Sequence, residues 1–136
     1  MEKSNKPLTL KQQTKLMDAL CETRSELFVS LCLYAGLRRN EALSLLWTDV
    51  HLDEKPYLDV RHITPKSGVS CRTVSISPQL QEILQRWKSR SEDTQVVHET
   101  AEKVMTDVRE QVNFRVTPPL LRHTYVSELQ KGNSKK

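Results

Sequence analysis

Apolar residues recur at helical spacing over most of the chain, and they alternate with polar residues only in a short central stretch. The first helical pattern follows Thr9 and Gln12, which form a capping-box signature. The pattern predicts an amphipathic helix that packs its apolar face against the rest of the domain. The side chains expected on that face are Leu16, Met17 and Leu20.

A second helical segment covers residues 27–35, which are apolar nearly all round. Thr23 and Glu26 repeat the capping-box signature before it, and Gly36 follows as a typical helix stop. A helix that is apolar on every side is buried, so we expect this one at the centre of the fold. A third helix should follow Gly36, and its apolar side is expected to carry Ala42, Leu43, Leu46 and Trp47.

The period changes after Asp49, where apolar and polar residues alternate. Val50 and Leu52 open this alternation, and residues 57–63 and 72–77 continue it on either side of a turn-forming segment. The pattern therefore predicts a small three-stranded antiparallel sheet.

Helical spacing returns in the second half of the chain. Ser77-Pro78 and Thr117-Pro118 each combine an N-cap residue with proline at the first helical position. The first of these helices is expected to carry Leu80, Ile83, Leu84 and Trp87 at helical spacing, and the last is expected to run to Gly132. Between them, regularly spaced valines predict a helix over residues 98–112. Helices, a small sheet and more helices indicate an α+β fold that is mainly α.

Composition is that of a folded domain, because 37% of the residues are hydrophobic and 28% are charged. At 136 residues we expect one domain over 8–136, after a disordered start or linker at 1–7. The net charge of +4 is compatible with a polyanionic partner. The spacing of the three cysteines predicts no metal site, and no apolar run is long enough to cross a membrane.

Arg38 lies at the joint between the second and third predicted helices, with Glu41 three residues later. Phosphoryl transfer builds negative charge on oxygens that a guanidinium group can hold in pairs, and Glu41 could fix the direction of that group. The alternative is a solvated arginine at a helix start, with the acid placed there by the helix dipole. Taken alone, the segment favours that alternative, and Arg39 is interpreted as a surface or DNA-backbone charge.

Two further segments carry candidate phosphate ligands. Lys66 lies at the tip of the predicted hairpin, where an ammonium group could protonate a leaving oxygen, although a solubilising lysine is the more general interpretation. Arg122 lies near the start of the last helix, where backbone N–H groups and the dipole favour an anion, with a surface ion pair as the alternative. The neighbouring His123 is interpreted as a structural histidine.

These segments, in this order, resemble the motifs of the tyrosine recombinases, also called phage integrases. Residues 36–50, with Gly-Leu-Arg-x-x-Glu-Ala-Leu at their start, resemble the first arginine motif of that family. Residues 64–74 resemble its β-hairpin lysine motif, and residues 121–124 resemble its second arginine motif. The resemblance covers nearly the whole chain, and the first motif is its most specific part.

The resemblance implies a helical catalytic domain that cuts DNA with a tyrosine, leaves a 3′-phosphotyrosyl link and rejoins strands without ATP. It implies Arg38 and Arg122 as a phosphate clamp and Lys66 as the general acid, with Glu41 and His123 in support. It implies no metal and no cofactor, because the arginines stabilise the charge. The implied partners are double-stranded DNA and other recombinase protomers, in the cytoplasm of a bacterial or phage-infected cell and without a membrane.

Two features depart from the family pattern. The histidine that the family places three residues before Arg122 is replaced by Pro119, which offers neither a donor nor a base. No tyrosine stands at the place of the family's nucleophile, so residues 8–136 are expected to lack the C-terminal nucleophile segment. Tyr34, Tyr57 and Tyr125 are instead expected to pack within the fold.

Three hypotheses for function follow. The first is DNA site-specific recombination or integration, with this chain as an incomplete catalytic domain that binds DNA phosphate and cannot cleave alone. The alternative is a recombinase-like module that binds DNA or a partner without cutting, which Pro119 favours. The third is a helical protein of unrelated function, and it predicts that the three basic side chains do not converge.

Overall fold

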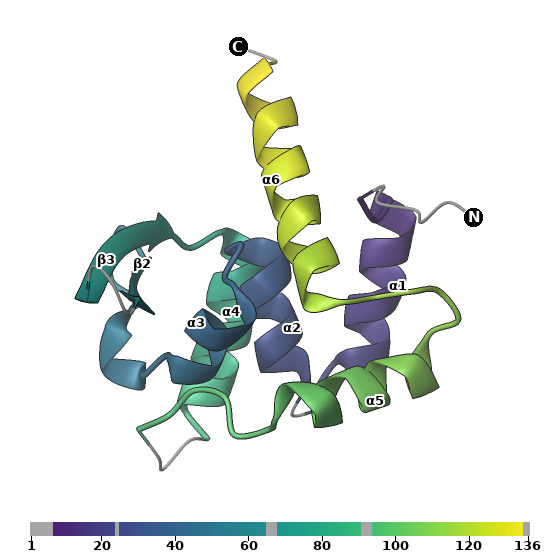
Figure 1. Ribbon diagram of the computed structural model, residues 1–136, viewed down its shortest axis with the longest axis horizontal. Helices are drawn as coiled ribbons and strands as arrows, with labels where there is room; N and C mark the ends of the chain where they lie inside the picture. The colour runs from purple at the N-terminus through teal and green to yellow at the C-terminus, as the bar shows by residue number, and fades with distance from the viewer. Residues whose placement is uncertain (1–6, 24, 65–67, 91–93, 135–136) are drawn as a thin grey trace.

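The computed structural model describes residues 7–23, 25–64, 68–90 and 94–134, and the mainly helical α+β fold is confirmed (Figure 1). The elements in chain order are α1 (Leu10–Leu20), α2 (Ser25–Tyr34), α3 (Arg39–Ser44), the 3-10 helix η1 (Trp47–Asp49), β1 (Val50–His51), β2 (Tyr57–Thr64), β3 (Gly68–Ser75), α4 (Pro78–Lys88), α5 (Ala101–Gln111) and α6 (Pro118–Ser134). In Figure 1, α6 rises from the body of the domain, the sheet lies at one side and α5 runs beneath.

The central buried helix is confirmed as α2. All its residues from Ser25 to Leu33 are buried, and it contacts α1, α3, α4, α5 and α6. Gly36 ends this segment with a positive φ of 69°, a conformation that glycine adopts without strain. The Leu37 N–H returns to the carbonyl of Leu31 at 3.3 Å, so the chain turns sharply here and enters α3 in a defined direction.

The first helix is also as predicted. The Gln12 N–H donates to the Thr9 hydroxyl at 3.1 Å, and the Thr9 N–H donates to the Gln12 side chain at 3.0 Å, which completes the capping box. The three predicted apolar residues of α1 are buried. The Leu8 N–H donates to the buried Thr124 hydroxyl of α6 at 3.1 Å, so the start of α1 is fixed to the last helix.

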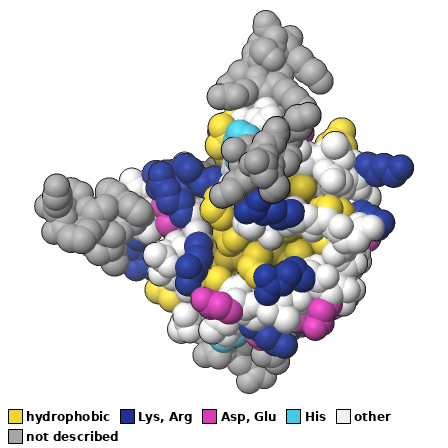
Figure 2. Space-filling model, turned by 45° about the vertical axis from the view of Figure 1, so that its right-hand side comes forward, with side chains coloured by type: hydrophobic (Ala, Val, Ile, Leu, Met, Phe, Trp, Pro, Cys, Tyr) yellow, Lys and Arg dark blue, Asp and Glu magenta, His cyan; other side chains and the backbone are white. Residues whose placement is uncertain are grey.

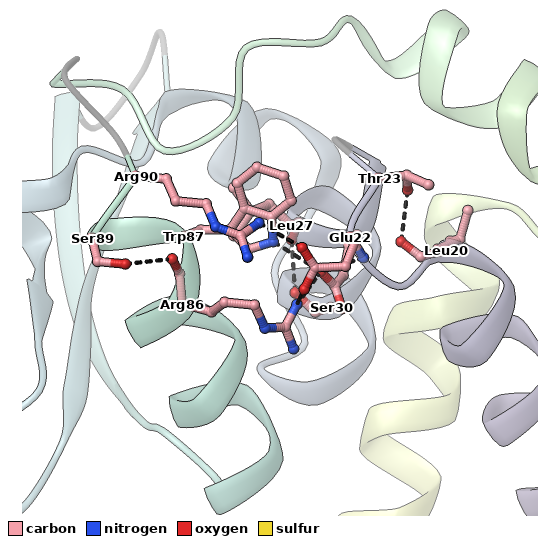
Figure 3. Close-up of polar contacts among 10 residues, drawn as sticks. Leu20, Glu22, Thr23, Leu27, Ser30, Arg86, Trp87, Ser89 and Arg90 are labelled. Atoms are coloured by element: carbon pink, nitrogen blue, oxygen red, sulfur yellow. Dashed lines mark hydrogen bonds and ion pairs between the residues drawn. The ribbon is translucent and has the colours of Figure 1, made fainter.

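The capping box predicted from Thr23 and Glu26 is wrong. The Thr23 hydroxyl donates to the Leu20 carbonyl at 2.7 Å, while the Glu26 side chain is turned towards α4. Glu26 is buried, and its Oε1 accepts hydrogen bonds from Arg86 Nη1 and Trp87 Nε1, both at 2.8 Å (Figure 3). The Glu26 carboxylate therefore does not form the local cap, because Arg86 and Trp87 of α4 donate to it, and these hydrogen bonds join α2 to α4.

The third helix is shorter than predicted. It ends at Ser44, and Leu45 is already extended, with φ −68° and ψ 135°. The Leu45 carbonyl accepts the N–H of Val96 at 3.1 Å, and the Trp47 N–H donates to the carbonyl of Thr94 at 2.8 Å. Pairing with this distant segment takes Leu46 and Trp47 out of the helix, so the predicted apolar side of α3 retains only its first half.

The sheet has the order β1-β2-β3 and is antiparallel throughout, as predicted. Its strands differ from the prediction in length, because β1 ends at His51 and β3 begins at Gly68 rather than Arg72. The pairing of β3 with β2 continues without a break to Thr64 opposite Gly68, which extends β3 beyond its alternating part. Because Val60 faces Arg72 in this register and is buried, Arg72 lies on the inward side of the sheet.

The later helices follow the predictions closely. The Leu80 N–H donates to the Ser77 hydroxyl at 3.3 Å. Of the four apolar residues predicted for α4, Leu80, Ile83 and Leu84 are buried and Trp87 is half-buried. The next helix, α5, begins at Ala101 after a Thr100 cap, three residues later than predicted, and α6 continues past Gly132. Among the described residues, no helix is both long and apolar enough to span a membrane.

Candidate phosphate-binding site

A cavity of about 860 Å³ opens between α3, α5 and the start of α6. Four arginines and a histidine line it, namely Arg38, Arg39, Arg109, Arg122 and His123. Glu102 is the one acid among the lining residues, and apolar side chains of α5 and α6 form part of the wall. On the face that Figure 2 presents, apolar surface lies between several Lys and Arg side chains. The arginines therefore favour an anion in this cavity, and the apolar wall reduces the screening of their charges by water.

Arg38 reaches the cavity from the N-cap position of α3. Its backbone is extended, and its carbonyl accepts the first helical hydrogen bond, from the Ala42 N–H at 2.9 Å. Glu41, at the third helical position, accepts the Arg38 N–H on Oε1 at 2.8 Å and contacts Arg38 Nη1 with Oε2 at 3.4 Å. The arginine side chain is 49% exposed and the glutamate only 1%, so the acid is a fixed internal partner of a side chain that remains accessible.

Glu41 has a second partner that the sequence analysis did not identify. Arg72 donates from Nη1 to Oε2 at 2.8 Å and from Nη2 to Oε1 at 3.0 Å, a paired arrangement typical of arginine and carboxylate. Burial alone would raise the pKa of Glu41, but the hydrogen bonds from Arg72 and from the Arg38 backbone outweigh burial and lower this pKa to about 2. The carboxylate is thus held ionised between two arginines.

A signal for this pair was present in the sequence. Val74 and Ile76 are apolar residues of an alternating stretch, and the same alternation places Arg72 on their side of the strand. An arginine on the inward face of a sheet needs a buried acid, and Glu41 is such an acid.

Arg122 reaches the same cavity from the first turns of α6. Its Nε donates to the Gly36 carbonyl at 3.0 Å, which anchors the guanidinium group at the joint that precedes Arg38. Within the part of the chain that the structure describes, this is the one hydrogen bond of the Arg122 side chain. The donors on its two terminal nitrogens are therefore available to a ligand. Arg38 and Arg122 line one cavity, so these two side chains do not lie on separate patches of surface.

The backbone contribution predicted for the start of the last helix is not available. Pro118 and Pro119 carry no N–H, the Leu120 N–H donates to the Thr117 hydroxyl at 3.2 Å, and the Leu121 N–H donates to the Thr117 carbonyl at 3.0 Å. The N–H groups of Leu120 and Leu121 are thus already hydrogen-bonded to Thr117. An anion in the cavity must be held by side chains.

The remaining lining residues sharpen the sequence interpretation. His123, interpreted from the sequence as a structural histidine, is exposed and lines the cavity. Pro119 also lines the cavity, so the side-chain donor that it lacks is lacking from the site itself. Arg39 lies near Glu102, with Nη2 and Oε2 3.5 Å apart, and both side chains are largely exposed. Arg109 was not singled out in the sequence, although its spacing of four from Met105 places both on one face of α5.

Lys66 and the three tyrosines are the remaining residues that the sequence analysis considered. Lys66 falls outside the described residues. None of the three tyrosines lines the cavity: Tyr34 is half-buried, with its pKa raised by burial, Tyr57 stacks on His51 with ring centroids 4.2 Å apart, and Tyr125 packs against Gly36. Among the described residues, no cluster of three or more His, Cys, Asp or Glu could hold a metal ion.

The chain is similar in fold to several solved structures. It matches the XerA recombinase with a TM-score of 0.79 at 21% identity, over 97% of this chain and 53% of that one. It matches the Tn1549 transposon integrase in complex with circular intermediate DNA with a TM-score of 0.69 at 14% identity, over 96% and 54% of the two chains. A lambda integrase tetramer bound to a Holliday junction matches with a TM-score of 0.62 at 19% identity, over 92% and 42%.

The chain spans about half the length of the first two of these structures. No protein with a curated description matches its sequence closely. The sequence pattern of the phage integrase family matches residues 6–134, which is nearly the whole chain. On that match, and with the fold in agreement, the chain belongs to the phage integrase family.

Proposed function

We propose that this chain binds the phosphate backbone of double-stranded DNA as part of the catalytic domain of a site-specific tyrosine recombinase. The observation that supports this most strongly is that Arg38 and Arg122, from two separate family motifs, line one cavity. Arg39 and Arg109 add positive charge to the same cavity. Because the chain belongs to the phage integrase family, we infer that the polyanion it binds is DNA.

In this proposal a phosphodiester enters the cavity and receives charge-assisted hydrogen bonds from both motif arginines. Arg122 is anchored through Nε, so its terminal nitrogens meet one non-bridging oxygen, and Arg38 meets the other. The negative charge on these oxygens grows when a nucleophile attacks, and the arginines stabilise that state more than the ground state. Lys66 is proposed as the general acid, and Glu41 and His123 as supporting groups.

The domain over residues 8–136 is proposed to supply charge stabilisation without the nucleophile, because no tyrosine lines the cavity. Cleavage would then require a tyrosine from outside this sequence, because none of its three tyrosines lines the cavity. Other recombinase protomers are proposed partners, as in the tetramer of lambda integrase on a Holliday junction. Since the proposed substrate is DNA in a bacterial or phage-infected cell, we place this activity in the cytoplasm.

Removing either motif arginine is expected to weaken the binding of duplex DNA. We expect Arg38→Ala and Arg122→Ala each to raise the Kd by roughly tenfold, because a hydrogen bond to a charged phosphate contributes about 1.5–3 kcal/mol. Each change should also reduce the slope of log K against log salt concentration by about 1. Fluorescence anisotropy of a labelled duplex at several salt concentrations measures both quantities.

The matched control is Arg90→Ala, which removes one exposed arginine outside the cavity. It is expected to change the Kd far less than either cavity variant. If all three variants lose affinity equally, binding is a general charge effect and the proposed site is wrong.

Pro119 supports a second candidate function, a module that occupies DNA without cutting it. Proline lines the cavity where the family motif has histidine, so a proton carrier or phosphate donor is missing. We expect this chain to form no covalent complex with nicked suicide duplexes of randomised central sequence, under conditions where an active tyrosine recombinase does so on its own site. A protein–DNA band that persists on a denaturing gel, with DNA attached to Tyr34, Tyr57 or Tyr125, would show that the chain has a nucleophile. It would therefore refute the proposal of a module that does not cut DNA.

A further inference from the structure

We propose that Arg72 is a positioning residue for Arg38: it compensates the charge of Glu41 and so keeps the Arg38 side chain extended towards the cavity. The inference rests on the proposed function, in which Arg38 binds a DNA phosphate. Arg72 itself does not line the cavity and acts through Glu41.

The geometry around Glu41 divides its carboxylate unequally between the two arginines. Arg72 makes two short hydrogen bonds, at 2.8 and 3.0 Å, one to each oxygen. The Arg38 side chain makes a single long contact of 3.4 Å, and the tight bond of 2.8 Å comes from its backbone N–H instead. The guanidinium group of Arg38 is therefore the weaker partner and is the one left free to bind elsewhere.

The origin of Arg72 explains why it is fixed. It lies on the inward face of β3 opposite the buried Val60, and the strand is held by continuous pairing with β2. Its side chain is 38% exposed while that of Glu41 is 1% exposed, so the sheet brings a partly solvated arginine to an almost fully buried acid. The pair thereby ties the hairpin to α3, the helix that Arg38 begins.

Loss of Arg72 would remove two short hydrogen bonds from an almost fully buried carboxylate. Such a charge is costly unless it is well paired, and Arg38 Nη1, already 3.4 Å from Oε2, can close onto it as a tighter ion pair. Arg38 would then turn back from the cavity, and a phosphate would have to compete with Glu41 for it. Arg72 thus maintains the accessibility of Arg38 rather than contacting the ligand.

The test is a double-mutant cycle on the Kd for duplex DNA. We expect Arg72→Gln to weaken binding about fivefold to tenfold in the wild-type background and less than about twofold when Arg38→Ala is already present. Arg72→Lys should weaken binding less than Arg72→Gln but still measurably, because lysine keeps the charge but cannot reproduce the paired hydrogen bonds. If Arg72 acted as a simple charge on DNA, Arg72→Lys would bind like the wild type and the two changes would be additive.

The matched control is Arg61→Gln on the adjacent strand. Arg61 is 41% exposed and pairs with Asp49 at 2.6 Å, so this variant removes a comparable arginine from the same sheet without touching Glu41. It is expected to leave the Kd within about twofold of the wild type. Loss of affinity as large as that of Arg72→Gln would overturn the proposal.

An NMR measurement without DNA separates this inference from the proposed function. In Arg72→Gln the titration midpoint of the Glu41 carboxyl carbon should rise from about 2 towards its ordinary value, and the Arg38 side-chain nitrogen signals should shift as the ion pair closes. Unchanged Arg38 signals would refute the positioning role, whatever the DNA result. If these signals move but Arg38→Ala leaves DNA binding intact, the positioning stands and the phosphate-binding function fails.

Discussion

Replacing Gly36 with alanine is expected to lower the free energy of unfolding by about 2–5 kcal/mol, a large part of the stability of a domain of this size. The φ of 69° at Gly36 disfavours any side chain by about 1–2 kcal/mol. A Cβ atom at this position would also lie 2.3 Å from Cδ2 and 2.7 Å from Cε2 of Tyr125, so the ring or all of α6 must move. Such overpacking typically adds about 1–3 kcal/mol.

The same change should disturb the cavity. The Gly36 carbonyl anchors Arg122, and both Arg122 and Tyr125 belong to α6, so displacement of the ring moves the arginine with it. Urea unfolding measures the stability, and duplex anisotropy measures the effect on binding. Gly68→Ala is the control, because Gly68 has a φ of 77° but no atom within 4 Å of an added Cβ. Equal losses for the two variants would show that contact with Tyr125 adds nothing.

Replacing Glu26 with alanine is expected to lower the free energy of unfolding by about 3–5 kcal/mol. The side chain is 3% exposed and accepts hydrogen bonds from Arg86 and Trp87. Without it Trp87 Nε1 loses its acceptor, and Arg86 keeps only the exposed Glu22 as an ion-pair partner. Figure 3 shows Arg86 and Trp87 side by side at this junction. Urea-induced unfolding monitored by the fluorescence of the tryptophans gives the difference directly.

Glu22→Ala serves as the matched control for Glu26→Ala. Glu22 pairs with the same Arg86, at 3.2 Å, and with Arg90 at 2.6 Å, but its side chain is 49% exposed. Water screens exposed ion pairs, so this change should leave the unfolding midpoint nearly unchanged. A similar loss in both variants would mean that burial of Glu26 is not what makes its ion pair important.

Local patterns were sufficient for most of the fold. The Thr9, Ser77 and Thr117 caps, the stop at Gly36 and the apolar spacing of α1, α2 and α4 depend on residues within one or two turns of each other. Such interactions are present in the sequence itself, and the predictions made from them were confirmed. The local signature failed at Glu26, because its carboxylate instead accepts a hydrogen bond from Arg86, which lies 60 residues away in the sequence.

For the site, local and distant information divide differently. Arg38 and Arg122 could be singled out because each lies in a motif of the family, and Glu41 because it is three residues from Arg38. Arg72 was missed as the partner of Glu41, and Arg109 as a residue of the cavity. Both depend on how a strand or helix is rotated against another element, which residue type and spacing suggest only weakly.

The sequence by itself determined the class of fold, the two motif arginines and membership of the phage integrase family, because periodicity, caps and motif spacing act over short stretches of chain. The tertiary structure alone decided that α3 ends early, that the first turn of α6 has no free N–H donors for an anion, and that Glu41 is shared between Arg38 and Arg72. Each of these depends on the position of a hydrogen-bonding group in the assembled fold, and such positions are settled only when helices and sheet pack together.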